Sequence, residues 1–73
     1  MNRSIIYVQY SDGSKPKGKK VTLGFSSGTT SPAYTDFEGK AVIEHASTGR
    51  ATVYVNGSDK GTFNAPGTHS AFL

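Results

Sequence analysis

The sequence predicts a single all-β domain, a small antiparallel β-sandwich of about six or seven short strands. Turn signals recur about every ten residues, a spacing typical of sandwiches and small barrels rather than of βαβ folds. Between the turns, apolar and polar residues alternate with the period of two that half-buried strands show. Nine glycines and three prolines supply the turns, and 73 residues are enough for one domain, residues 1–73.

One polar turn, Tyr34 to Gly39, is the stretch around which the rest of the chain is organised. Asp36 can hydrogen-bond its own backbone two residues on, and Gly39 can adopt the positive φ that such a turn often needs. The turn leads directly into Lys40 to Ala46, which is expected to be a half-buried strand. One face of that strand carries Ala41 and Ile43, and the other carries Lys40, Val42 and Glu44.

The other expected strands show the same alternation to different degrees. The first is apolar on both faces, which suggests a central or sandwiched strand. The second has the cleanest alternation, with Val21, Leu23 and Phe25 on one face, and in the last Ser70 and Phe72 can share a face and complete the sheet. In chain order these strands are Ser4 to Tyr10, Lys19 to Ser26, Ala33 to Thr35, Arg50 to Asn56, Lys60 to Phe63 and Thr68 to Leu73.

The segments between these strands are predicted to be loops and turns. Ser11 to Gly18 contains Asp-Gly and Lys-Pro pairs that continue neither a helix nor a central strand. Ser26 to Pro32 is polar and flexible enough to be a mobile tip. Asn56 and Gly57 form a strong hairpin signal, because both residues tolerate the positive φ of a type I′ turn.

Composition restricts the classes of function. Apolar residues make up 34% of the chain, so we expect a thin core and no deep catalytic cleft. The chain has no cysteine, which excludes disulfides, thiolate nucleophiles and zinc sites built on cysteine. No stretch has the apolar run of a signal peptide or of a membrane span. As written, the chain is expected to be cytoplasmic and without membrane contact, and to be secreted or surface-exposed if it is an excised module.

The residues that could carry catalysis or bind a metal do not form a recognisable set. No spacing selects a Ser-His-Asp arrangement around either histidine. His45 is expected at the end of its strand with a backbone carbonyl as partner, and His69 is expected as an exposed tail residue. Turn carboxylates gathered at one end of a sandwich can hold Ca²⁺, but local hydrogen bonding is the preferred interpretation, and we expect no catalytic residue, metal or cofactor. These carboxylates are Asp12, Asp36, Glu38 and Asp59.

Half of the eight basic side chains lie within one short segment of this chain, whose net charge is +3. Clustered ammonium groups displace counterions from a phosphate backbone, so this segment is the best candidate for contact with a polyanion. The alternative is a solvated loop that keeps a β edge from pairing. Tyr7, Tyr34 and Tyr54 could stack bases, although strand tyrosines are more often core or cross-strand partners. The clustered lysines are Lys15, Lys17, Lys19 and Lys20.

A succession of motifs carries a likeness to a known family. An apolar strand precedes Asp12-Gly13 and Pro16, the strand Val21-Thr22-Leu23 follows, Thr35 to Ala41 forms a T-D-x-x-G turn that opens a strand, and Gly49 precedes the alternating strand up to Val55. This order resembles the carboxypeptidase regulatory-like domains over Ile5 to Val55. The resemblance implies a transthyretin-like (prealbumin-like), immunoglobulin-like β-sandwich. It also implies an accessory, adhesive or structural module rather than a catalyst.

The sequence therefore predicts a non-enzymatic interaction or structural module that acts through protein–protein contacts, with a protein partner or by self-association. The contact is expected at a loop end or by strand addition at a free sheet edge. The alternative is a small basic nucleic-acid-binding β-barrel that uses the Lys15 to Lys20 loop. Contact residues are expected to be Lys15, Lys17, Lys19, Lys20, Tyr34, Phe37 and Glu38, and structural turn residues Asp36, Gly39, Asn56 and Gly57.

Overall fold

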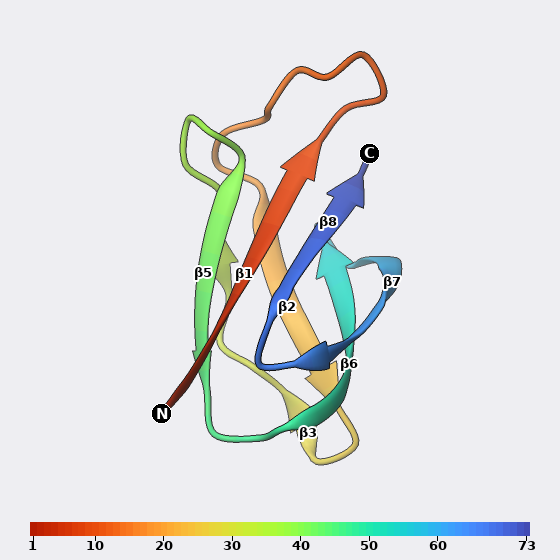
Figure 1. Ribbon diagram of the computed structural model, residues 1–73. Coiled ribbons are helices and arrows are strands. Elements are labelled where there is room, and N and C mark those ends of the chain that lie inside the picture. Colours follow the sequence, from red (N-terminus) through yellow and green to blue (C-terminus); the bar gives the residue numbers. More distant parts are fainter.

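A computed structural model describes all 73 residues, and Figure 1 shows that every regular element is a strand. The prediction of an all-β chain without helix is confirmed, and no helix that could cross a membrane is present. The strands number eight: β1 (Asn2–Gln9), β2 (Lys20–Phe25), β3 (Gly28–Thr29), β4 (Ala33–Tyr34), β5 (Lys40–His45), β6 (Gly49–Val55), β7 (Ser58–Ala65) and β8 (Thr68–Phe72).

The strands form two sheets. The first has the order β5-β1-β8, so β1 is the central strand that its apolar faces predicted. The second has the order β3-β2-β6-β7, and β4 pairs with the other end of the same edge of β2. Neighbours pair antiparallel except β1 and β8, which run parallel. In Figure 1, β5, β1 and β8 lie in front of β2 and β6.

Both sheets contribute to one hydrophobic core. The inward residues of β1, β5 and β8 meet those of β2, β6 and β7 in a single cluster, which confirms the alternation predicted for these strands. Apart from Ser4, the fully buried side chains are aliphatic and small, so the core is as thin as the composition indicated. The cluster consists of Ile6, Val8, Val21, Leu23, Ala41, Ile43, Ala51, Val53, Val55, Ala65 and Ala71.

The polar turn before β5 has the predicted construction. A carboxylate oxygen of Asp36 accepts hydrogen bonds from the backbone N–H of Glu38 at 2.8 Å and of Lys40 at 3.0 Å. Gly39 has a φ of +73°, and its N–H donates to the carbonyl of Asp36 at 2.9 Å. The carbonyl of Gly39 then accepts from the N–H of Val8 at 2.7 Å. The turn is therefore attached to the central strand, which explains its organising role.

The charge on Asp36 makes this turn sensitive to acid. The Lys40 N–H, followed by the Glu38 N–H, holds the pKa of Asp36 below its ordinary value of 3.8. Because the native pKa is lowered, the contribution of the carboxylate to stability is fully present above the ordinary value and is lost as the pH falls through the lowered one. We expect the melting temperature to fall between about pH 5 and about pH 2.

The matched variant for this prediction is Asp36→Asn, whose amide oxygen accepts the same bonds at every pH. Its melting temperature, followed by circular dichroism, is expected to fall less over the same interval. Some fall remains, because the Ser14 hydroxyl lowers the pKa of Asp12 in the same direction. Parallel pH profiles for the two proteins would contradict the role given to Asp36.

The hairpin between β6 and β7 also follows the prediction. Asn56 and Gly57 have φ values of +52° and +84°, as a type I′ turn requires. Strand β7 is longer than expected, because pairing starts at Ser58 and not at Lys60. The register shifts between Thr52 and Tyr54 of β6, where Lys60 and Gly61 of β7 lie opposite the single residue Val53. Strand β7 therefore contains a bulge, which interrupts the alternation that sequence reasoning follows.

Two other segments test the sequence assignments. The mobile tip predicted for Ser26 to Pro32 is wrong in part, because Gly28 and Thr29 pair with β2 as strand β3. Thr30 continues this contact, since its N–H donates to the Leu23 carbonyl at 2.9 Å and its hydroxyl accepts from the Leu23 N–H at 3.1 Å. The tail strand is confirmed as β8, and Ser70 and Phe72 share its outward face.

Candidate interaction surfaces

The structure brings the predicted contact residues together at one end of the molecule. Lys20 of β2 pairs with Tyr34 of β4. The Thr35 hydroxyl accepts from the Lys19 N–H at 2.9 Å, and the Thr35 N–H donates to the Lys19 carbonyl at 3.0 Å. The Gly18 N–H donates to the Thr35 carbonyl at 2.8 Å. These bonds join the lysine loop to the polar turn, and we call residues 10–20 and 34–40 together the loop end.

The loop end carries free positive charge beside exposed aromatic rings. Phe37 is 77% exposed and Tyr34 is 60% exposed. The one ion pair of the molecule joins Arg3 of β1 to Glu44 of β5 at 3.4 Å, outside the loop end. No loop-end lysine therefore forms a salt bridge. Sequence reasoning missed two members of this surface, Lys40 and Tyr10. The signal for Lys40 was its place beside Gly39, while Tyr10 was assigned to the first strand and instead follows it.

The three tyrosines proposed as base-stacking partners are not gathered at one place. Tyr7 lies on the outer face of β1, opposite Lys40 of β5. Tyr54 is half-buried on β6, where its ring lies over Gly24 of β2. Of the three, Tyr34 alone belongs to the loop end, so the stacking set expected from sequence is dispersed.

Strand β8 presents a second surface, an open sheet edge. At its two ends the Gly67 carbonyl accepts from the Ile5 N–H at 2.9 Å, and the Leu73 N–H donates to the Gln9 carbonyl at 2.9 Å. Because alternate residues bond to one neighbour, Thr68, Ser70 and Phe72 direct their N–H and C=O groups away from β1. No other strand pairs with β8, so these groups face outward without a backbone partner.

The other sheet edges are protected in ways that β8 is not. Strand β7 carries Asp59 and Lys60 and contains the bulge. The edge of β2 is covered by β3, Thr30 and β4. On β5 the Lys40 backbone is occupied by Asp36, and the exposed charge of Glu44 lies farther along. Natural edges are defended by charge, proline and bulges, and β8 has none of these.

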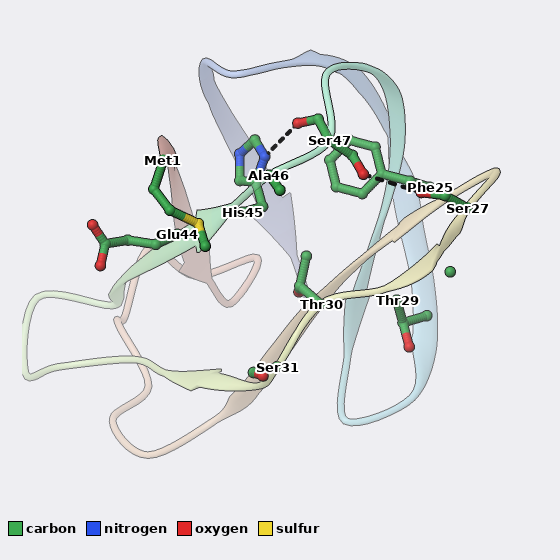
Figure 2. Close-up of a pocket in the computed structure, with 11 residues that line it drawn as sticks. Met1, Phe25, Ser27, Thr29, Thr30, Ser31, Glu44, His45, Ala46 and Ser47 are labelled. Atoms are coloured by element: carbon green, nitrogen blue, oxygen red, sulfur yellow. Dashed lines mark hydrogen bonds between the residues drawn. The ribbon is translucent and has the colours of Figure 1, made fainter.

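A third feature is a hollow of about 320 Å³ at the end opposite the loop end, shown in Figure 2. It lies between the end of β5 and the hairpin of β2 and β3, and its lining includes Phe25, Thr30 and His45.

The His45 Nδ1 donates to the Ser47 carbonyl at 2.7 Å, which confirms the backbone partner predicted for this ring. The other nitrogen, Nε2, then accepts from the Ser4 hydroxyl at 2.7 Å.

The pairing of Ser4 with His45 has the connectivity of a hydrolase Ser-His pair but not its access. Ser4 is 0% exposed, and its oxygen also accepts the Gly67 N–H at 3.2 Å. A substrate therefore cannot reach the hydroxyl, and the pair joins β1, β5 and the turn before β8. Sequence reasoning missed Ser4, because a serine in an apolar strand gives no signal of its partner.

The exposed position predicted for His69 is wrong. Its ring is half-buried and stacks on Phe63 with 5.5 Å between ring centroids. Its Nε2 donates to the Lys60 carbonyl at 3.3 Å. Strand β8 pairs with β1 in one sheet, and the side chain of His69 extends from β8 to β7 of the other sheet. His69 therefore connects β8 with β7.

Three of the four turn carboxylates, Asp12, Asp36 and Asp59, serve local hydrogen bonds, as the preferred interpretation stated, while the Glu38 carboxylate makes none. One oxygen of Asp12 accepts from the N–H and the hydroxyl of Ser14, at 2.9 and 2.7 Å. An oxygen of Asp59 accepts from the Gly61 N–H at 2.9 Å. No group of three or more histidine, aspartate or glutamate side chains is placed to hold a metal ion.

Comparison with known proteins gives a likeness in fold. No family model and no curated relative matches this chain. The chain superposes over 99% of its length on part of the Bacillus anthracis TIE protein, with a TM-score of 0.69 and 14% identity, and it spans 16% of that chain. The C-terminal domain of the PapC usher gives a TM-score of 0.48 and 23% identity, with 97% of this chain and 94% of that chain covered. At these identities, the TIE protein shows that this arrangement of strands occurs as one part of a longer chain.

Proposed function

We propose that this chain is a non-enzymatic interaction module that acts through protein–protein contacts at the β8 edge. The observation that carries the proposal is the row of outward backbone groups on Thr68, Ser70 and Phe72, on an edge without charge, proline or bulge. Such an edge pairs with an added strand, whose main-chain bonds supply affinity. The inaccessible hydroxyl of Ser4 supports the non-enzymatic part of the proposal.

We also propose that the two sheets form a β-sandwich of the transthyretin-like kind, related to the carboxypeptidase regulatory-like domains. Three features support this. Both sheets share one core. The T-D-x-x-G turn of Thr35 to Gly39 opens β5, and Gly49 stands at the start of β6, as the family pattern expects. Members of that family are usually accessory or adhesive modules, which agrees with a contact through a sheet edge.

The occupant that the β8 edge fits is a second copy of the same strand. Two β8 strands can pair antiparallel around a two-fold axis, with Ser70 opposite Ser70. Phe72 then lies opposite Thr68 of the second copy, a pairing of an aromatic with a β-branched side chain that favours antiparallel strands. No charged residue lies on β8, so no like charges meet across the axis. The pairing would also cover Phe72, which is 56% exposed.

The test is the mass of the particle by size-exclusion chromatography with light scattering, at micromolar to near-millimolar protein and at low and high salt. We expect a dimer that is insensitive to salt, because backbone bonds and apolar contacts hold it together. Ser70→Lys, which places a charge on the edge, and Ser70→Pro, which removes an outward N–H, are expected to give monomers.

The matched control is Ser58→Lys, which adds the same charge to β7, the edge that already carries Asp59 and Lys60. It is expected to leave the dimer intact. A chain that is monomeric at every concentration would contradict self-pairing, and a dimer that Ser58→Lys breaks as readily as Ser70→Lys would assign the contact to another surface.

A further inference from the structure

We propose that the loop end is a binding site for single-stranded nucleic acid, separate from the β8 edge. Its lysines would contact phosphates, and Phe37 and Tyr34 would stack on bases. The site does not depend on the protein–protein contact proposed above, because its residues lie in the loop before β2, in the turn before β5 and at the adjoining ends of β2, β4 and β5, and none lies on β8.

The first support is that backbone bonds fix the relative positions of the lysines and the rings. The hydrogen bonds of Thr35 to Gly18 and Lys19 hold the lysine loop against the turn. Gly39 packs against the Lys15 side chain, since a Cβ at Gly39 would lie 3.2 Å from that of Lys15. The charges and rings are thus presented as one surface and not as independent loops.

The second support is that the positive charges of the loop end outnumber the negative ones and are not held in ion pairs. The loop end has five lysines and three carboxylates, and no salt bridge involves any of these lysines. Two of the three carboxylates there are already engaged by N–H or hydroxyl groups, Asp12 by Ser14 and Asp36 by the turn backbone. Phosphates can therefore be bound without breaking an existing ion pair, and counterion release drives the association. The five lysines are Lys15, Lys17, Lys19, Lys20 and Lys40.

The third support is the exposure of the rings, which favours a single strand. Phe37 and Tyr34 are the most exposed aromatic side chains of the chain, at 77% and 60%. A ring of this kind stacks on an unpaired base of any sequence, whereas the bases of a duplex are already stacked on each other. Phe37 is the one large side chain of the loop end that lacks a polar atom. A single such side chain provides little apolar area for insertion into a bilayer, so a membrane surface is not the ligand that this site favours.

The experiment is fluorescence anisotropy with a labelled single-stranded oligonucleotide in a series of salt concentrations. If all five lysines contact phosphate, affinity should fall about 100-fold between 50 and 200 mM salt, at a slope of about 0.7 per contact. In the variant with Lys17, Lys19 and Lys20 changed to Gln, the affinity should fall less than about tenfold over the same salt interval, since two phosphate contacts remain. Phe37→Ala should weaken binding about tenfold through the lost stacking partner.

The matched control changes Arg3, Arg50 and Lys60 to Gln, which removes the same charge outside the loop end. It should keep the wild-type salt slope. Ser70→Pro should bind the oligonucleotide as the wild type does, so that failure of the edge contact and failure of this site are told apart. Equal losses in the two triple variants, a preference for duplex DNA or for anionic vesicles, or no binding by the wild type would each overturn the proposal.

Discussion

Replacing Gly39 by valine is expected to lower the free energy of unfolding by at least ~2 kcal/mol, and the melting temperature by about 8 to 16 °C. Two costs add at this position. The φ of +73° is strained for any residue with a Cβ. A Cβ here would also collide with the backbone carbonyl of Val8, which is part of the central strand and cannot move aside as a side chain can. Relief requires the turn to move away from β1, with loss of the bond from the Val8 N–H to Gly39.

A second glycine of the same conformation separates the two costs. Gly18 has a φ of +76°, and a Cβ added there meets nothing within 4 Å. Gly18→Ala should therefore show the conformational cost alone, about 1 kcal/mol. Gly39→Ala should cost clearly more, as measured by urea unfolding of both variants. Equal losses would show that the close approach of Gly39 to Val8 is not what fixes the turn.

The close contact that distinguishes Gly39 from Gly18 is long-range, and long-range contacts are the part of the fold that the sequence does not predict. Alternation gave the faces of β2, β5 and β6, and the chemistry of Asp36, Asn56 and Gly57 gave their turns, because these signals are local. The parallel pairing of β1 with β8 could not be predicted, because it joins opposite ends of the chain. The contact of Gly39 with Val8 depends on the same long-range arrangement. Strand β3 escaped prediction because it is two residues long and its ladder is completed by a Thr30 hydroxyl.

The same distinction between local signals and long-range pairing applies to the candidate surfaces. The lysine cluster and the turn with Phe37 stand out in the sequence, and their union at one end follows from the pairing of Lys20 with Tyr34. The β8 edge could be expected only as one of several edges, because strand order decides which edge remains free. The pairing of Ser4 with His45 spans 41 residues, and neither residue indicates the other.

That buried pair carries the second large effect. Ser4→Ala is expected to lower the free energy of unfolding by about 2 to 4 kcal/mol, because it removes at once the partner of the buried His45 ring and of the half-buried Gly67 N–H. The His45 Nε2 loses the hydroxyl that donates to it at 2.7 Å, and the Gly67 N–H loses the oxygen that it reaches at 3.2 Å. Ser27→Ala is the control, because its hydroxyl bond to Ser47 is exposed to solvent, and it should change stability by no more than ~0.5 kcal/mol.

A double-mutant cycle with His45→Leu decides whether the loss comes from the hydrogen bond or from the cavity left by a smaller side chain. With leucine at position 45 there is no ring nitrogen to leave unsatisfied, so Ser4→Ala should then cost about 1 kcal/mol less than it does in the wild type. Additive losses in urea unfolding would contradict the hydrogen bond as the source of the effect. A coupling of the expected sign would mean that a Ser-His pair with the connectivity of a catalytic one stabilises the junction of β1, β5 and the turn before β8.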